Sequence, residues 1–288
     1  MKGLGKKKLW SHLSIDGKSK YTNRKIRLSK AKEVGSFREL VKIIASISYN
    51  SPEYSLFYRG QAEDYELLSG ASSLYPSIYR MKGRSITKDV LKDKFNILKK
   101  AEGLLLNAFK SNKLEGHSKL ANFRELVWAV LQHYEVCKTP LLDITHSLRV
   151  ASSFALEGSR SYGYVFVLGF PHIHGSISYY VEEELLNIKL LSICPPQAQR
   201  PYFQEGFLVG TFPTAEENKQ PKLDAAKRLI AKFEIQKPSF WDQDFHEIPH
   251  NALYPKNDRV EDICKEIKQQ LKLDSINNTT PSDCLHAG

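Results

Sequence analysis

The chain has 288 residues, of which 41% are hydrophobic and 26% are charged. This length and composition are typical of a globular protein with one large domain or two small ones. No apolar run approaches the roughly 18 residues that span a bilayer, and the basic N-terminus lacks the apolar stretch of about 7–15 residues found in secretory signals. We therefore expect a soluble, cytoplasmic protein with no membrane partner.

The excess positive charge of the chain lies at its N-terminus. The net charge is +10, and residues 1–32 hold eleven Lys and Arg but a single acid, Asp16, which leaves 31 basic and 31 acidic residues in the other 256. We expect 1–32 to form a flexible basic arm that attracts polyanions, with a solubilising tail as the plainer alternative. Trp10 and Tyr21 lie among these cations, where they could stack on bases.

The first ordered elements are expected after residue 33. Ser36 and Glu39 have the spacing of a capping box and precede an apolar run at helical spacing. An aromatic-rich strand is expected over 54–60, where a glycine ends it. Helices follow over 88–110 and 121–134, the second of them starting at Asn122.

The second half of the chain is expected to hold most of the strands. A helix capped by Ser147 precedes a central strand with alternating apolar residues, and a closing amphipathic helix precedes a polar tail. The expected elements are a helix over 147–157, strands over 162–170, 188–193 and 203–212, and a helix over 259–271.

Because helices come first and most strands later, the expected fold class is α+β. We expect mixed sheets with flanking helices, a helical N-terminal half and a disordered basic arm. The chain is expected to divide into the arm at 1–32, one domain at 33–272 and a polar C-terminal tail at 273–288.

Several common catalytic motifs are absent from the sequence. There is no GxxxxGK[ST] loop, no GxGxxG after a strand, no HExxH and no GxSxG, so ordinary nucleotide hydrolysis, dehydrogenation, zinc proteolysis and serine hydrolysis have no support. The four cysteines are scattered without CxxC spacing, which argues against a disulfide framework and against a metal site. Three clusters of polar residues remain.

The first cluster surrounds Arg59, at the end of the expected strand. Gly60 follows it and lets another chain or a ligand approach closely. A guanidinium in this place suits phosphate or carboxylate, which it holds with two parallel hydrogen bonds. The alternative is a buried arginine that pairs with an acid such as Asp143.

The second cluster joins His133 to the segment 145–147, where an expected strand runs directly into a helix. Thr145, His146 and Ser147 place hydroxyls and backbone N–H groups at the start of that helix, a geometry that favours anions. The alternative is that Ser147 only caps the helix and that His133 is a satisfied core histidine.

The third cluster contains Gln204 and Glu205, within the expected strand over 203–212. Neighbouring side chains of a strand point to opposite faces, so only one of the two can face a given cleft. The sequence leaves open which one does.

These segments, in this order, resemble the FRG domain, a family named for its Phe-x-Arg-Gly pattern. The resemblance extends over about 33–270. The matching segments are Phe57-Tyr58-Arg59-Gly60, Leu74 to Arg80, His133-Tyr134 through Thr139 with Leu141-Leu142-Asp143 and Thr145, Val150 to Ala155, Arg200 with Gln204 and Gly206, and Asn251 to Pro255. The segment with Arg200, Gln204 and Gly206 departs slightly from the family's Arg-x-x-x-Gln-x-Gly-x-Phe form at its end, because the final apolar position is Leu208 and Phe207 stands one place early.

The layout of the FRG-like segments is similar to that of ADP-ribosyltransferases that use an Arg, a Ser-Thr-Ser strand and a later glutamate. This similarity implies NAD as a co-substrate and no metal. The position of the glutamate is the departure, since the family pattern places Gln204 there, whereas a carboxylate would better stabilise a cationic sugar and favours Glu205. The implied catalytic residues are Glu205, Gln204 and Ser147, and the implied NAD-binding residues are Arg59, Gly60, Gln61, Arg80, His133, Thr145 and His146.

The resemblance therefore implies an NAD-dependent ADP-ribosyltransferase, of the kind found in bacterial toxins and anti-phage defence effectors, with a neutralising antitoxin protein as an expected partner. The basic arm favours nucleic acid as the acceptor, RNA before DNA. Two alternatives stay open at this point. One is a protein-modifying transferase of the same chemistry, and the other is a non-catalytic nucleic-acid-binding module.

Overall fold

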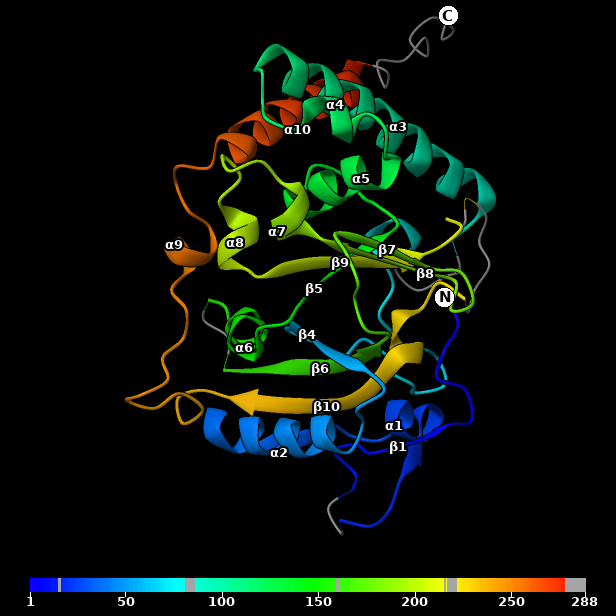
Figure 1. Cartoon of the computed structure of the whole chain (residues 1–288), viewed down its shortest axis with the longest axis vertical. Helices are drawn as coiled ribbons and strands as arrows, with labels where there is room; N and C mark the ends of the chain where they lie inside the picture. The colour runs from blue at the N-terminus through cyan, green and yellow to red at the C-terminus, as the bar shows by residue number, and fades with distance from the viewer. Residues whose placement is uncertain (15–16, 81–85, 159–160, 215, 217–221, 278–288) are drawn as a thin grey trace, which may run out of the picture.

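The computed structural model describes residues 1–14, 17–80, 86–158, 161–214, 216 and 222–277. Its centre is an eight-stranded mixed sheet in the order β3-β10-β6-β4-β5-β9-β8-β7 (Figure 1). Neighbouring strands are antiparallel except for β3 and β10, which are parallel. The strands are β3 (Lys32–Val34), β4 (Ser55–Gln61), β5 (Leu141–Thr145), β6 (Tyr162–Phe170), β7 (Ile177–Tyr180), β8 (Leu185–Lys189), β9 (Gly206–Thr211) and β10 (Leu229–Gln236).

The sheet is almost divided at its middle. β4 pairs with β6 from Ser55 to Gln61, but it pairs with β5 only at Tyr58 and Thr145. β5 in turn pairs with β9 along its whole length. The sheet therefore consists of two four-stranded halves that are joined at one pair of residues and separate beyond it.

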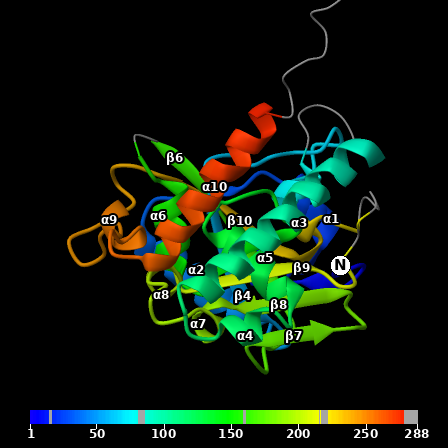
Figure 2. The ribbon, with the colours of Figure 1, turned by 90° about the horizontal axis from the view of Figure 1, so that it is seen from above.

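Each half has its own hydrophobic core and its own helices. One core lies around β10, β6 and β4 with α1 (Asn23–Leu28) and α2 (Phe37–Tyr49), and the other lies under α3 (Lys88–Ser111), α5 (Arg124–His133) and α10 (Arg259–Asn277). Seen from above, α3 and α10 lie over the second half (Figure 2), and they contact each other. The shorter helical elements are α4 (His117–Leu120), η1 (Ser77–Tyr79), α6 (Leu148–Ala155), α7 (Leu190–Ile193), α8 (Arg200–Phe203), η2 (Ala225–Arg228) and α9 (His250–Leu253).

The α+β class and most of the long elements agree with the sequence-based expectations. Ser36 caps α2, its hydroxyl accepting from the backbone N–H of Glu39, and β6 covers the expected strand residue for residue. α5 begins at Arg124 instead, because Phe123 takes the cap position and no side chain caps the helix. No helix among the described residues is long and apolar enough to cross a membrane.

The expectation of a flexible, disordered arm over 1–32 is wrong for its described residues. Met1, Leu4, Leu9 and Ile26 are buried in the first core. A two-stranded sheet of β1 (Lys8–Leu9) and β2 (Tyr21–Thr22) and the helix α1 order the segment. The charged side chains are spaced between these apolar ones, so the segment buries one set and exposes the other.

Two further expectations need correction. The segment 188–193 is the end of β8 followed by α7, and the first residues of 203–212 belong to α8 and a turn rather than to a strand. β7 and β10 were not expected from the sequence. α10 continues to Asn277, past the expected start of the tail at 273, and 278–288 lie outside the described residues.

Candidate functional site

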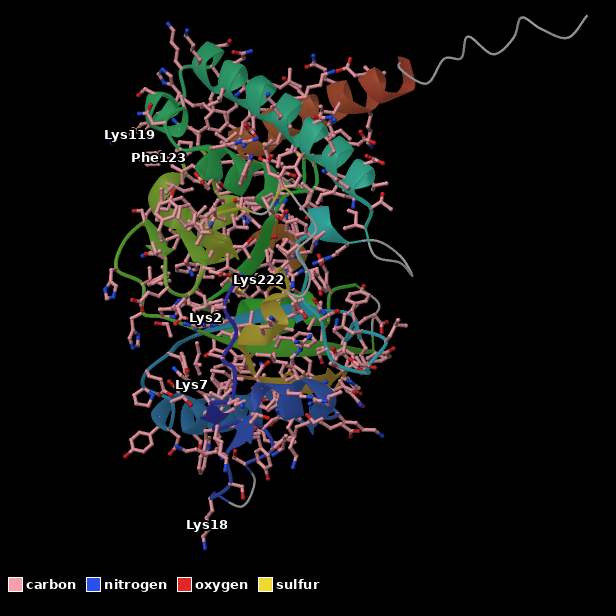
Figure 3. The ribbon with its side chains drawn as sticks, turned by 90° about the vertical axis from the view of Figure 1, so that its right-hand side faces the viewer. Lys2, Lys7, Lys18, Lys119, Phe123 and Lys222 are labelled. Atoms are coloured by element: carbon pink, nitrogen blue, oxygen red, sulfur yellow. The ribbon has the colours of Figure 1, made fainter. Side chains whose placement is uncertain are left out.

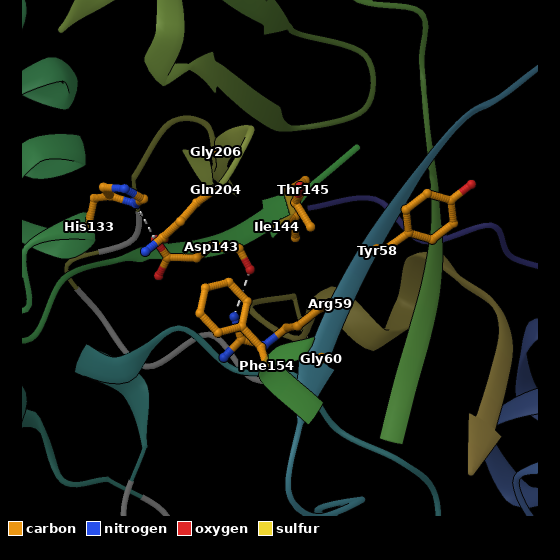
Figure 4. A pocket seen from close by; sticks show the side chains of 10 residues that line it. All are labelled: Tyr58, Arg59, Gly60, His133, Asp143, Ile144, Thr145, Phe154, Gln204 and Gly206. Carbon is orange, nitrogen blue, oxygen red and sulfur yellow. Dashed lines mark hydrogen bonds and ion pairs between the residues drawn. The ribbon is translucent and has the colours of Figure 1, made fainter. Parts of the chain in front are cut away.

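A small cavity, which we call the junction cavity, opens where β4 and β5 separate (Figure 4). Its volume is about 50 Å³. Residues from both sheet halves, from α5 and α6, and from the turn before β9 meet around it. They are Tyr58, Arg59, Gly60, His133, Asp143, Ile144, Thr145, Phe154, Gln204 and Gly206.

Arg59 connects the two strands just beyond their single pair. Its Nη1 donates to the backbone oxygen of Asp143 at 2.6 Å, and its Nε donates to Gln61 Oε1 at 3.2 Å. The contact goes to the carbonyl of Asp143 and not to its carboxylate, so the guanidinium is not neutralised by a direct ion pair. Nη2 makes no hydrogen bond to any described residue. Burial and the nearby Arg80 lower the pKa of Arg59 to about 10, which still leaves it protonated near neutral pH.

Asp143 supplies the only carboxylate among the lining residues. Gln132 Nε2 donates to its Oδ2 at 2.8 Å, and His133 Nδ1 lies 3.3 Å from its Oδ1. Burial raises the pKa of Asp143, but the hydrogen bond from His133, the charge of Arg59 and the hydrogen bond from Gln132 together hold it below its usual value. The carboxylate side chain is 37% exposed and ionised, and it faces the cavity.

His133 is the buried partner of that carboxylate. Burial lowers its pKa, so the imidazole is neutral near pH 7. Because an ionised Asp143 can only accept, the His133 proton lies on Nδ1. Nε2 is buried and has no hydrogen-bond partner among the described residues. His133 is therefore a buried histidine whose tautomer is fixed by Asp143, while its other ring nitrogen has no hydrogen-bond partner among the described residues.

Gly60 explains how α6 comes to border the cavity. A Cβ at this position would lie 1.7 Å from the backbone oxygen of Ala151, so only glycine allows the helix to pack this closely on β4. The expectation of a close approach at Gly60 is confirmed, and the approaching chain is α6. Phe154 on the same helix then closes one side of the cavity.

The start of α6 is built as the sequence indicated. Ser147 is the N-cap and accepts from the N–H of Val150, while Thr145 Oγ1 accepts from the N–H of Ser147. Of the three residues over 145–147, only Thr145 lines the cavity. His146 packs instead against the rings of Phe57 and Phe207.

The turn between α8 and β9 resolves the choice between Gln204 and Glu205. Gln204 is buried, lines the cavity and donates from Nε2 to the backbone oxygen of Leu253 at 2.9 Å. Glu205 is exposed, has a positive φ of 45°, and is not among the lining residues. The expectation that both residues belong to one strand is wrong, because a short helix, α8, runs from Arg200 to Phe203 and β9 starts only at Gly206.

The remaining expected residues stand beside the cavity rather than in it. Gln61 orients Arg59. Arg80 is exposed, donates from Nε to the backbone oxygen of Tyr75, and interacts electrostatically with both Arg59 and Asp143. Asp143 was expected as a structural partner of Arg59 and as the carboxylate to consider next if Glu205 were not the catalytic group, and its position as the single acid of the apolar strand β5 is a signal that points to it.

The arrangement can attract an anion and stabilise a developing positive charge at adjacent points. Arg59 and Arg80 supply two cations, and Asp143 supplies an ionised carboxylate beside them. A water occupies about 30 Å³, so a cavity of about 50 Å³ takes one small group of a ligand and not a whole dinucleotide. A large substrate would have to leave most of its atoms outside the cavity.

Comparison with protein families gives one match. Residues 54–163 match the model of the FRG domain. No curated protein and no solved structure matches the chain. The resemblance that the sequence motifs indicated over 33–270 is therefore supported over 54–163, the segment that runs from the start of β4 into β6 and supplies Arg59 and Asp143 to the junction cavity.

Proposed function

We propose that the protein is an NAD-dependent ADP-ribosyltransferase whose reacting centre is the junction cavity. The observation that carries the proposal is that Arg59, whose Nη2 makes no hydrogen bond to any described residue, and the ionised Asp143 meet at the point where β4 and β5 separate. The first supports binding of a diphosphate, and the second supports stabilisation of a cationic sugar.

The chemistry requires little beyond these groups. The bond between nicotinamide and ribose breaks, nicotinamide leaves with the bonding electrons, and a nucleophile of the acceptor forms the new bond to the sugar and loses its proton. Positive charge develops on the sugar during this step, so a preorganised carboxylate lowers the barrier. Asp143 takes the role that the charge argument gave to Glu205, because Glu205 lies outside the cavity lining.

The exposed basic residues of 1–32 favour nucleic acid over protein as the acceptor. Residues 1–32 carry an excess of ten positive charges, and most of their basic side chains are exposed. Such a surface attracts polyanions without selecting a sequence. RNA is the acceptor we propose, and a bacterial toxin or anti-phage effector is the corresponding biological role.

Incubation of the purified protein with labelled NAD and either total RNA or total protein tests this function. We expect label in RNA, and we expect Arg59→Ala and Asp143→Asn to reduce transfer by about 10²–10³-fold. Arg59→Lys should restore little, because an ammonium cannot reproduce the fork of the guanidinium. Arg38→Ala is the matched control, since the exposed Arg38 pairs with Asp242 and Asp244, outside the junction cavity.

The outcomes separate the alternatives. Label in protein would select the protein-modifying transferase. Absence of label and of free nicotinamide in every reaction, with RNA binding retained, would leave a non-catalytic binding module. Equal activity in the wild type and the Arg59→Ala variant would remove the junction cavity from the mechanism.

A further inference from the structure

A second and much larger cavity, which we call the N-terminal cavity, lies between the N-terminal segment and the rest of the first sheet half. Its volume is about 700 Å³. It shares no lining residue with the junction cavity. The residues that line it are Lys2, Gly3, Gly5, Asn23, Arg24, Arg27, Leu28, Leu67, Ser69, Ala71 and Lys227.

The charge of this lining is one-sided. Four of its side chains are cationic and none is acidic. Arg27 forms an ion pair with Asp224, with 2.5 Å between Nη2 and Oδ2, and it donates from Nε to the backbone oxygen of Ser72. Lys2, Arg24 and Lys227 make no side-chain hydrogen bond or ion pair with any described residue. Lys227 interacts electrostatically with the buried Asp224, which also pairs with Arg27. The lining therefore carries more cations than acids, and a concave surface of this kind attracts an anion.

The walls that carry these cations are fixed by backbone contacts. The N–H of Leu4 donates to the oxygen of Lys227 at 3.0 Å, and a Cβ on Gly3 would lie 2.9 Å from the Cβ of Lys227. Asn23 Nδ2 donates to the backbone oxygens of Ala226 and Leu229, and these hydrogen bonds attach α1 to the start of β10. The cations therefore project from a backbone that is ordered before any ligand arrives.

Another part of the lining is apolar, and Leu28 in it lies one turn from Arg24 on the same helix, α1. Leu28, Leu67 and Ala71 form this part, and the turn over 67–71 is closed by a hydrogen bond from the N–H of Leu67 to the oxygen of Ala71. A volume of about 700 Å³ lies within the range of roughly 300–1,000 Å³ that is usual for sites of small organic ligands. A ligand that suits both the cationic and the apolar part of the lining has an anionic group and a flat or apolar group.

We propose that the N-terminal cavity binds a nucleoside phosphate, with the phosphates on Lys2, Arg24 and Lys227 and the base or sugar against Leu28 and Leu67. The ligand is either a free nucleotide or the phosphorylated end of a nucleic acid strand. Figure 3 shows Lys222, Lys2 and Lys7 following one another down one side of the molecule toward Lys18, and of these Lys222 pairs with Glu184. The proposal does not depend on the transferase activity.

Equilibrium titrations with the full chain test this site. The probes are ATP, adenosine, and a short single-stranded RNA carrying either a 5′-phosphate or a 5′-hydroxyl. We expect Arg24→Ala/Lys227→Ala to weaken binding of the phosphorylated probe by about tenfold or more. Lys6→Ala/Lys8→Ala removes the same charge from exposed residues outside the lining and should change the affinity for ATP by less than about twofold.

A second pair of variants tests the cavity without removing a cation. Ser69→Asp places a carboxylate in the lining and should weaken binding, whereas Ser69→Asn should not. Tighter binding of ATP than of the 5′-phosphorylated RNA identifies a free nucleotide as the ligand, and the reverse identifies a strand end. Equal weakening in the Arg24/Lys227 and Lys6/Lys8 variants, or no binding of any phosphorylated probe, overturns the proposal. The thermal unfolding of each variant is measured as a control, and an unchanged unfolding temperature shows that a loss of binding does not come from a loss of folding.

Discussion

The junction cavity and the N-terminal cavity both present arginine side chains, yet they hold them in opposite ways. In the first, Arg59 is fixed by two hydrogen bonds and stands beside an ionised carboxylate. In the second, Arg24 and two lysines make no side-chain hydrogen bond or ion pair with any described residue. The first is small and built from residues far apart in sequence, and the second is wide and takes three of its four cations from 1–32.

The difference teaches which variants should be informative at each site. A site built on fixed geometry depends on the identity of each residue, so conservative changes should have large effects. A site built on uncompensated charge depends on the number of cations and on salt, so single changes should have small and additive effects. The predictions below test this contrast, from the largest expected effect to the smallest.

Glycines of the two cavities give the strongest contrast. Gly60→Ala would place a Cβ 1.7 Å from the backbone oxygen of Ala151, and neither β4 nor α6 can move away without breaking the sheet junction. We expect a loss of more than about 4 kcal/mol in the free energy of unfolding, or no folded protein. Urea unfolding followed by circular dichroism measures this loss.

The matched variant lies in the N-terminal cavity. Gly5 has a φ of +60°, but a Cβ there would meet no atom within 4 Å. Gly5→Ala should therefore cost only the backbone strain, about 1–2 kcal/mol. A similar cost for the two variants would show that the contact between α6 and β4 yields easily, and the junction cavity would then be less rigid than we infer.

Contacts that are local in sequence were predictable at the junction cavity. The cap at Ser147 and the strand β6 follow from short patterns, and both are confirmed. The role of Gly60 followed from its place after a strand. The positions of Gln204 and Glu205 did not follow, because α8 forms where Arg200 becomes buried beside Tyr134 and Tyr254, two contacts far away in the chain.

The N-terminal segment was not predictable for a related reason. Its charge pattern is typical of a flexible arm, and its buried residues Met1, Leu4, Leu9 and Ile26 follow neither a helical nor a strand period. What orders it is burial against β10, a strand that was itself not expected. The sequence could have predicted this packing only if both the N-terminal segment and β10 had been identified as ordered elements.

The pH dependence of stability tests how firmly the N-terminal segment is attached. His12 is buried, its Nδ1 accepts from the N–H of Lys232 at 3.3 Å, and its Nε2 lies within hydrogen-bond distance of Ser29 Oγ and the oxygen of Lys30. Burial lowers the pKa of His12 from 6.5 to about 4. Between these values the unfolded chain binds more protons than the folded one, so stability falls as the pH falls from 6.5 to 4, by about 3 kcal/mol in total.

We expect His12→Gln to flatten that fall, because the variant has no imidazole to protonate. His174→Gln, at an exposed histidine, is the control and should retain the wild-type slope. Urea unfolding at several pH values measures both. A wild-type slope in His12→Gln would mean that other groups carry the pH dependence and that His12 does not anchor the segment as a neutral ring.

The turn before β9 allows a comparison of two neighbouring side chains. Gln204 lines the junction cavity and Glu205 does not, so we expect Gln204→Met to reduce label transfer by about 10²-fold and Glu205→Gln to leave it unchanged. Rates of NAD consumption and of label transfer check both variants. A loss of transfer in Glu205→Gln alone would restore the glutamate to the reacting centre and remove Asp143 from that role.

The smallest expected effect concerns stability rather than binding. Arg24 and Lys227 make no side-chain hydrogen bond or ion pair with any described residue, and Lys227 interacts with Asp224 only through its charge, so Arg24→Gln/Lys227→Gln breaks no hydrogen bond. We expect the free energy of unfolding to stay within about 0.5 kcal/mol of the wild type, with any gain confined to low salt, where the Debye length is about 30 Å at 0.01 M against about 3 Å at 1 M. Arg59→Gln is the counterpart in the junction cavity, and it should destabilise at every salt concentration because it disrupts the contact with the Asp143 carbonyl. Urea unfolding of both variants at low and high salt measures the difference. If the Arg24/Lys227 variant lost more than about 1 kcal/mol, these cations would be structural, and the contrast between a fixed site and a charged site would not hold.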